Sequence, residues 1–286
     1  MTQELIFDLG LNNGDDSAFY LSQGYRVVAV DANPLMVEQA KMQFRQEIES
    51  GALQVLNVGI AKSEGYADFW VCDDKPQFSS FFEGIASRDG LKCHRVQVPT
   101  VRFASLLRQY GVPYYLKIDI EGHDQTCLAD LSGAHLPRYI SIESECPKSR
   151  SHADPEEGLQ VLSTLKTLGF CKFKLIDQYS FCSLRRPTSL SYLLDTFARR
   201  FLDCPPFCHF PATYRLSRRL KTRSRLASKF KWEFPAGSSG VWGDDTPGRW
   251  LTYEQARRSF QFYRELHFRN PASTFHSFWC DWHAGC

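Results

Sequence analysis

Short apolar runs alternate with amphipathic segments along the first part of the chain. The runs predict strands at 4–9, 26–30 and 53–59, and the segments predict helices at 15–23 and 33–50. Asn33 before Pro34 is a typical helix start, because asparagine caps free N–H groups and proline suits the first turn. Gly51 marks the end of this helix.

The alternation continues with less regular spacing. Further strands are predicted at 66–71, 95–98, 114–118 and 139–143, and further helices at 103–110, 124–131 and 155–168. Residues 171–176 and 179–184 alternate around Asp177 and Gln178, as the two arms of a hairpin do. We therefore expect an α/β fold with a doubly wound, mostly parallel sheet and a closing antiparallel hairpin.

The character of the chain changes after residue 184. Residues 185–231 are rich in Arg and Lys, and a further helix is predicted over 252–268. We predict a ligand-binding domain over residues 1–184 and a basic, aromatic-rich, mostly helical extension, residues 185–286, packed on it. The basic stretch itself favours amphipathic helices with a solvated face.

The composition supports a folded enzyme-sized protein. Hydrophobic residues make up 43% of the 286 residues and the formal net charge is only +2, so the whole chain is no obvious nucleic-acid or membrane binder. The chain has neither an apolar run of about 18 residues nor a basic, signal-like start. We expect a cytoplasmic protein with no membrane span.

Ten cysteines are scattered at irregular spacings. Without a secretory signal, most are expected to be reduced, partly buried thiols. The groups at 204–209 and 280–286, which combine cysteine and histidine, offer a zinc site as the weaker alternative, because their spacings match no standard finger.

The first strand runs directly into a glycine turn, Asp8-Leu-Gly10-Leu-Asn12-Asn13-Gly14. Glycine permits positive φ and a close approach of a ligand to the backbone. The following helix then directs free N–H groups at that ligand. By itself this pattern also suits an ordinary connection between a strand and a helix.

The second strand ends at Asp31, about 20 residues past the turn, where an acid is placed to bind both hydroxyls of a ribose. Asn33 already caps the next helix, so Asp31 is available for this role. The third strand ends at Asn57, Val58 and Gly59, which suit the edge of an adenine. The expected cofactor contacts are Asp8, Gly10, Asn12, Asn13, Gly14, Asp31, Ala32, Asn57, Val58, Gly59 and Asp119.

Charge distinguishes two possible cofactors. NAD usually requires a second glycine close behind the first, where this chain has Asn12. Asp15 and Asp16 at the helix start would repel its pyrophosphate. The sulfonium and ammonium groups of S-adenosylmethionine would instead be attracted, so the charges favour that donor.

Two motifs resemble those of the FkbM-type methyltransferases. Asp8, Gly10, Asn12 and Gly14 match the family's first motif, although Leu11 replaces its usual small residue, and residues 117–122 match Lys-Ile-Asp-x-Glu-Gly in full. Weaker agreement comes from Ser79-Ser80-Phe81 and Ile142-Glu143. The resemblance covers residues 4–184. It implies a class I methyltransferase, Rossmann-like fold, S-adenosylmethionine as donor, and O-methylation of a hydroxyl on a sugar or natural product.

Methyl transfer to a hydroxyl requires donor and acceptor in line and the removal of a proton. Lys117, Asp119 and Glu121 would share one side of the chain if the strand stayed extended. Three assignments are open: Asp119 or Glu121 as general base, His123 as base, or Asp119, Glu121 and Glu143 as ligands of Mg²⁺. The alternative for the acids is an ion pair with Lys117. The expected catalytic residues are Lys117, Asp119, Glu121 and His123.

The acceptor is less well defined. Ser79 and Ser80 in the 73–92 loop, together with Glu143, are the expected substrate contacts, although Ser79 is equally consistent with turn formation. Trp242, Trp250, Trp279 and Trp282 are hypothesised to cover the acceptor cleft. The expected partner is a small molecule or glycan. An RNA or protein methyltransferase that docks through the basic stretch, and a non-catalytic binding module, are the alternative functions.

Overall fold

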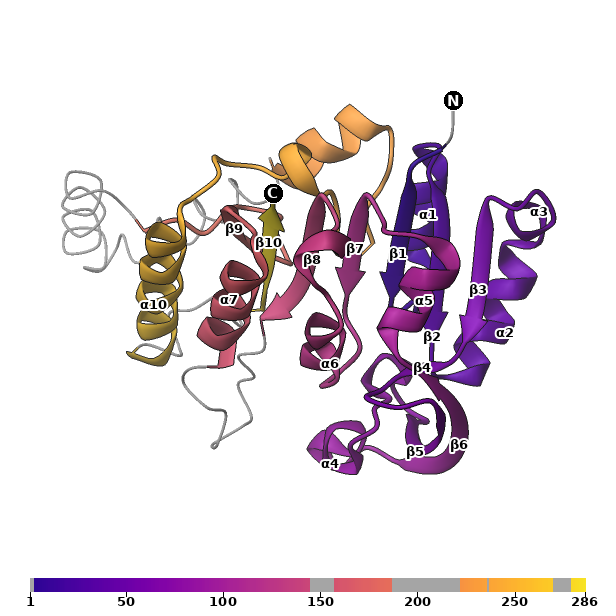
Figure 1. The fold of residues 1–286 in the computed structure, drawn as a ribbon. Coiled ribbons are helices and arrows are strands. Elements are labelled where there is room, and N and C mark those ends of the chain that lie inside the picture. Colours follow the sequence, from indigo (N-terminus) through magenta and orange to yellow (C-terminus); the bar gives the residue numbers. More distant parts are fainter. Residues whose placement is uncertain (1–2, 145–156, 187–221, 236, 270–278) are drawn as a thin grey trace, which may run out of the picture. The chain divides into compact units, whose positions relative to one another are not determined.

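A computed structural model of the chain describes residues 3–144, 157–186, 222–235, 237–269 and 279–286 (Figure 1). These residues form two compact units that interleave along the sequence. The N-terminal unit comprises Met1–Glu143, Thr164–Phe170 and Ala284–Cys286, and the C-terminal unit comprises Ser144–Ser163 and Cys171–His283. The domain boundary at residue 184 stays a prediction.

The N-terminal unit is built on parallel strands that run in the order β3-β2-β1-β7-β8. Their bounds are β1 (Leu5–Leu9), β2 (Arg26–Asp31), β3 (Leu53–Asn57), β7 (Tyr115–Ile118) and β8 (Tyr139–Ser144). Every residue of β1 and β7 is buried, because helices cover both faces of this sheet (Figure 1). The order reverses beside β1, and ligands bind at such a switch point.

The helices of this unit begin and end close to the predicted positions. They are α1 (Asp15–Ser22), α2 (Pro34–Gln43), α3 (Arg45–Glu49), α5 (Phe103–Tyr110) and α6 (Asp124–Ala129). The single helix expected over 33–50 is wrong, because the chain breaks at Phe44 into α2 and α3. Phe44 is 5% exposed and its ring packs against Gly14, which explains the break as a tertiary contact.

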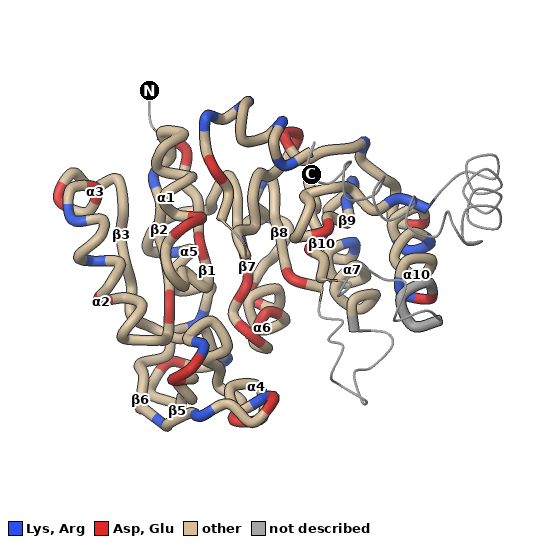
Figure 2. Tube along the Cα trace, turned by 180° about the vertical axis from the view of Figure 1, so that it is seen from behind, with Lys and Arg blue, Asp and Glu red and all other residues tan. Residues whose placement is uncertain are grey.

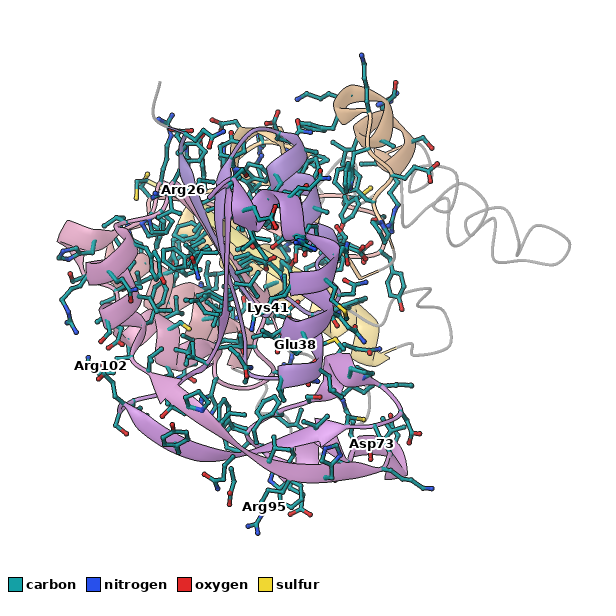
Figure 3. The ribbon with its side chains drawn as sticks, turned by 90° about the vertical axis from the view of Figure 1, so that its right-hand side faces the viewer. Arg26, Glu38, Lys41, Asp73, Arg95 and Arg102 are labelled. Carbon is teal, nitrogen blue, oxygen red and sulfur yellow. The ribbon has the colours of Figure 1, made fainter. Side chains whose placement is uncertain are left out.

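A second, small sheet has the strand order β4-β6-β5. Its strands are β4 (Gly59–Ile60), β5 (Gly65–Cys72) and β6 (Cys93–Val101), with β5 and β6 antiparallel. One side carries a buried cluster of Phe69, Val71 and Val98. The other side is polar and includes an ion pair between Arg95 and Asp68; Figure 3 shows Arg95 at this sheet and Lys41 near Glu38 on α2.

The 73–92 loop joins β5 to β6. It contains the short helices η1 (Pro76–Phe78), α4 (Glu83–Ala86) and η2 (Arg88–Gly90). Ser80 pairs with Trp70 of β5 as an isolated bridge, so the loop returns along the outer edge of the sheet.

The C-terminal unit has an aromatic core. The unit includes residues of α7 (Glu157–Leu168), β9 (Lys172–Asp177), η4 (Gly243–Asp245), α10 (Tyr253–Arg269) and β10 (Cys280–Gly285). Trp282 is fully buried, its ring lies 5.5 Å from that of Phe260 at a tilt of 30°, and it donates a 2.8 Å hydrogen bond to the carbonyl of Gly158. The hypothesis that Trp282 walls a cleft is therefore wrong, because this core encloses the indole.

The turn after β9 forms as predicted. The N–H of Asp177 bonds to the carbonyl of Cys182, and that of Leu184 bonds to Leu175. The second arm contributes only the bridge between Ile176 and Ser183, and the neighbour of β9 in the sheet is β10. A mostly parallel sheet with helices confirms the predicted α/β class.

None of the described helices is long and apolar enough to cross a membrane. Most of the basic stretch, residues 187–221, lies outside the described residues, as do Cys204, Cys208 and His209 of the zinc alternative.

Candidate functional site

The turn after β1 depends on glycine at two positions. Gly10 and Gly14 have φ of 89° and 82°, and Gly14 is the N-cap residue directly before α1. A Cβ on Gly10 would lie 1.8 Å from the carbonyl oxygen of Asp119, which follows β7. The backbones at the ends of β1 and β7 therefore approach so closely that only glycine fits between them.

A buried ion cluster holds these two strand ends together. Lys117 is 3% exposed, and its Nζ donates to Oδ1 of Asp8 at 3.0 Å and to the carbonyl of Gly10 at 2.9 Å. Oxygens of Asp16 and Asp119 lie 3.5 and 4.0 Å from the same nitrogen. Figure 2 shows acidic positions in β1 and at the lower end of β7. The cluster thus places three carboxylates around one ammonium group.

This arrangement shifts the pKa of Lys117, Asp8 and Asp119. Burial alone would lower the pKa of Lys117, but the neighbouring carboxylates outweigh burial and raise it well above its ordinary value. Burial raises the pKa of both Asp8 and Asp119, although Lys117 opposes the change. Ser17 stabilises the Asp8 carboxylate by a 2.7 Å hydrogen bond to its second oxygen.

Asp31 lies where β2 ends and is held in a fixed orientation. Its two carboxylate oxygens accept hydrogen bonds of 2.8 Å from the backbone N–H groups of Asn12 and Asn33. Burial raises its pKa to about 6. A carboxylate has about four lone-pair positions, so both oxygens can still accept a hydroxyl proton donor.

Asn57 connects the end of β3 to this group. Its Nδ2 donates to the carbonyls of Asp31 and Ala32, at 3.1 and 3.2 Å. The ends of β1, β2 and β3 are therefore tied together at one edge of the sheet. Of the other predicted contacts, Val58 is partly buried between β3 and β4, and Asn13 is exposed and bonds to Asp15.

The chain turns sharply after Asp119. Glu121 and Gly122 have φ of 47° and 101°, and the carboxylate of Asp124 accepts bonds of 3.2 Å from the N–H groups of Ile120 and Gly122. The extended geometry that would align Lys117 with Glu121 is therefore wrong. Asp124 and its loop bonds were not identified from the sequence, where Asp124 resembles a simple helix cap.

The predicted metal site does not form. The described residues contain no group of three His, Cys, Asp or Glu side chains that could hold a metal ion. Glu121 instead pairs with Arg88 at 2.9 Å, and the Asp119 carboxylate lies beside the Lys117 ammonium. Glu143 follows Ile142, the partner of Ile118 in β7, so it lies near the same sheet edge without completing a metal site.

Hydrogen bonds hold the 73–92 loop against the residues that follow β2 and β7. The hydroxyl of Ser79 accepts bonds from the N–H of Cys72 and from Nδ2 of Asn33, at 3.0 and 3.3 Å. The hydroxyl of Ser80 donates to the carbonyl of Glu121 at 2.8 Å. Both serines therefore connect the loop to β2 and β7, which supports the turn interpretation of Ser79.

His123 packs against two phenylalanine rings, a contact that the sequence did not predict. Its ring stacks on Phe81 at 4.7 Å and contacts Phe82 at 5.2 Å. Nδ1 lies 3.0 Å from the carbonyl of Ile60, which can only accept, so Nδ1 is the donor and Nε2 is the acceptor in the matching neutral tautomer. Phe81 also fills the space that a Cβ on Gly59 would need.

The fold and this site define a Rossmann-like α/β architecture, with a glycine turn after β1 and an oriented acid after β2. The family model described as "Methyltransferase FkbM domain" matches residues 8–171. The chain belongs to the FkbM methyltransferase family. No curated protein sequence matches it.

Two solved methyltransferase structures show similarity to this chain at low identity. The FkbM methyltransferase from Methylobacillus flagellatus KT is 14% identical, with a TM-score of 0.42 over 61% of this chain and 40% of that one. Phosphoethanolamine N-methyltransferase 2 from Haemonchus contortus, in complex with S-adenosyl-L-methionine, is 12% identical, with a TM-score of 0.37 over 99% and 49%. The chain thus spans less than half the length of these two proteins.

Proposed function

We propose that this methyltransferase uses S-adenosylmethionine to methylate a hydroxyl on a sugar or natural product. The observation that carries the donor assignment is the Asp31 carboxylate, which two backbone N–H groups orient beside the glycine turn. Membership of the FkbM family supports methyl transfer, and the resemblance of the motifs supports a hydroxyl acceptor.

The residues present suit this donor. Asp31 would accept from the ribose hydroxyls, the backbone that Gly10 brings close would line the amino-acid portion, and Asn57 lies where an adenine edge would be read. When bound, the donor supplies a methyl group on a positively charged sulfonium. Asp119, whose side chain is 27% exposed, offers negative charge toward that group.

We assign distinct roles to the four predicted catalytic residues. Lys117 is a positioning residue, because its ammonium is engaged by Asp8 and Gly10. Glu121 orders the loop through Arg88. Asp119 and His123 remain as candidate bases for the acceptor hydroxyl: a raised pKa makes Asp119 a stronger base, and Nε2 of His123 is an acceptor.

The alternative of an RNA or protein acceptor depends on the basic stretch. In its described part, Arg223 donates to the carbonyls of Tyr179, Phe234 and Pro235, and so serves the internal packing of the C-terminal unit. Arg223 therefore gives no support to nucleic-acid docking.

Calorimetry with S-adenosylmethionine tests the donor. The wild-type protein should bind it, and Asp31→Ala should weaken binding about 10- to 100-fold, because a hydrogen bond to a charged group contributes about 1.5–3 kcal/mol. Asp68→Ala is the matched control, since Asp68 is an exposed acid on the small sheet. Folded wild-type protein that binds no donor, or equal affinities in Asp31→Ala and wild type, would overturn the assignment.

The acceptor requires a separate experiment. Labelled methyl transfer into a panel of glycans and small hydroxyl compounds should give an alkali-stable ether product. Label found only in RNA, protein or amine compounds would contradict O-methylation while leaving the donor assignment intact. The pH profiles of Asp119→Asn and His123→Gln would then identify the base, because only loss of the base removes the acidic limb of the profile.

A further inference from the structure

Two cysteines face each other across the small sheet. Cys72, the last residue of β5, is the direct partner of Cys93, the first residue of β6, in the antiparallel register. Both are free thiols in this structure. They stand where the 73–92 loop leaves and rejoins the sheet, and neither belongs to the site described above.

The backbone hydrogen bonds around Cys72 show whether the two cysteines form a hydrogen-bonded or a non-hydrogen-bonded pair. Trp70 exchanges backbone hydrogen bonds with Ser80, and the N–H of Cys72 bonds to Ser79 on that same outer edge. Successive residues of a strand direct their backbone N–H and C=O groups to opposite edges, so Trp70 and Cys72 share the outer edge. Cys72 therefore directs no backbone N–H or C=O group toward β6. Cys72 and Cys93 are therefore a non-hydrogen-bonded pair.

That pairing brings the two side chains close together. Partners in a non-hydrogen-bonded pair have Cα atoms about 4.5 Å apart, and their side chains lie on the same face of the sheet. Disulfides span Cα separations of about 4.4–6.8 Å. A pair of this kind therefore has a backbone spacing that a disulfide can bridge.

We propose that Cys72 and Cys93 are a cross-strand disulfide site, oxidised by exchange with a low-molecular-weight disulfide such as oxidised glutathione. Cys93 is partly exposed and reacts first, whereas Cys72 is 0% exposed and needs to reach only Cys93. The proposal is independent of the methyltransferase assignment, because it rests on the geometry of β5, β6 and the adjoining loop.

The exchange balances in two steps. The Cys93 thiolate attacks one sulfur of oxidised glutathione, the glutathione S–S bond breaks, and one glutathione thiolate leaves from a mixed disulfide. The Cys72 thiolate then attacks the Cys93 sulfur, and the second glutathione leaves as a thiolate. The two cysteine protons pass to the two glutathione thiolates, so two protein thiols are oxidised and one glutathione disulfide is reduced.

The surroundings of Cys93 set the conditions for this reaction. Partial burial raises the pKa of the Cys93 thiol, and the carboxylates of Glu83 and Asp73 raise it further. Only the thiolate is the nucleophile, so the exchange should become faster as the pH rises toward the thiol pKa.

The bond would close the 73–92 loop, which carries Ser79 and Ser80. Because a covalent ring restricts the unfolded chain, the oxidised protein should have a higher Tm than the reduced protein. Cleavage within the loop by a protease should also leave the two halves covalently joined until a reductant is added.

The test uses the full chain and oxidised glutathione at pH 8, followed by alkylation and trypsin without reductant. Trypsin places Cys72 in the peptide 63–88 and Cys93 in the peptide 93–95. We expect these two peptides as one linked species, lighter by two hydrogen atoms than their sum, and its separation on reduction. Cys93→Ser should abolish it, whereas Cys171→Ser, which removes an exposed thiol, should not.

Three outcomes would overturn the proposal. Cys93 could persist as the glutathione mixed disulfide, which would mean that Cys72 cannot reach it. Cys93 could link to a different cysteine peptide, or both residues could remain alkylated while Cys171 is oxidised. Thermal unfolding of the serine variants under reducing conditions verifies that each one is folded.

Discussion

Gly10→Ala is the substitution that most directly tests the backbone contact between β1 and β7. The new Cβ would lie 1.8 Å from the Asp119 carbonyl oxygen and 2.8 Å from its carbon, both of which are backbone atoms. A flexible side chain cannot move aside to relieve such an overlap. Accommodation therefore requires displacement of the peptide after Asp119, on which the Lys117 cluster and the donor site both depend.

The cost has two parts. A non-glycine residue at the φ of 89° costs about 1–2 kcal/mol. Forcing extra atoms into a packed region costs about 1–3 kcal/mol more. Gly10→Ala should therefore lower the free energy of unfolding by about 2–5 kcal/mol and weaken donor binding at least tenfold, since a loss of about 1.4 kcal/mol suffices for that factor.

Gly24→Ala is the matched control. Gly24 has a nearly identical φ of 84°, but a Cβ there would meet nothing within 4 Å. It should lower stability by the conformational part alone, about 1–2 kcal/mol, and leave donor affinity unchanged. Urea unfolding and calorimetry on the two variants separate the steric effect from the conformational one.

Equal destabilisation by the two substitutions would refute this reasoning. It would mean that the Asp119 peptide moves without cost and that glycine is needed at position 10 only for its φ. Unchanged donor affinity in Gly10→Ala would likewise show that the contact between the two strand ends does not shape the donor site.

Three further predictions concern charge, pH and the C-terminal unit. Lys117→Ala should lower the free energy of unfolding by about 3–5 kcal/mol in urea unfolding, because it leaves buried carboxylates without their cation. The control Lys41→Ala, which breaks an exposed ion pair, should change the same free energy by less than about 0.5 kcal/mol. Asp31 has a folded-state pKa of about 6, above its ordinary value of 3.8, so its contribution to stability falls as the pH rises from 3.8 to 6. Urea unfolding of the wild type and Asp31→Asn at pH 4 and pH 6 measures this. The free energy of unfolding of the wild type, relative to that of Asp31→Asn, should be smaller at pH 6 than at pH 4. A constant difference would contradict the raised pKa. Trp282→Phe should lower the unfolding free energy by at least about 1 kcal/mol, through loss of the bond to Gly158, and an unchanged urea midpoint would contradict its anchoring role.

The parts of the fold that sequence predicted well are specified by local signals. Asn33 caps α2 through a bond to the N–H of Leu35, as its position before Pro34 indicates. The acid at the end of β2 and the glycines at 10 and 14 occupy the expected positions because strand length and turn geometry fix them. Such features require no knowledge of distant residues.

The errors share a different cause. The break at Phe44 follows from packing against Gly14, and the pairing of β9 with β10 joins segments far apart in the chain. Neither leaves a periodic pattern in the sequence. We expected Glu121 on an extended strand, but Asp124 bends the loop by accepting hydrogen bonds from two backbone N–H groups. The sequence does not reveal this role, because Asp124 stands where a simple helix cap would stand.

The ion cluster explains why charged residues occupy a core position beside β1. Lys117 balances one of the three nearby carboxylates of Asp8, Asp16 and Asp119, so the ionised cluster keeps negative charge at the sheet edge. Desolvation opposes this charge, which is why the pKa of Asp8 and of Asp119 rises. A cationic ligand would relieve that opposition by favouring the ionised carboxylates, whereas a pyrophosphate would add to it. We therefore expect the residues that hold β1 against β7 to favour a cationic ligand over an anionic one.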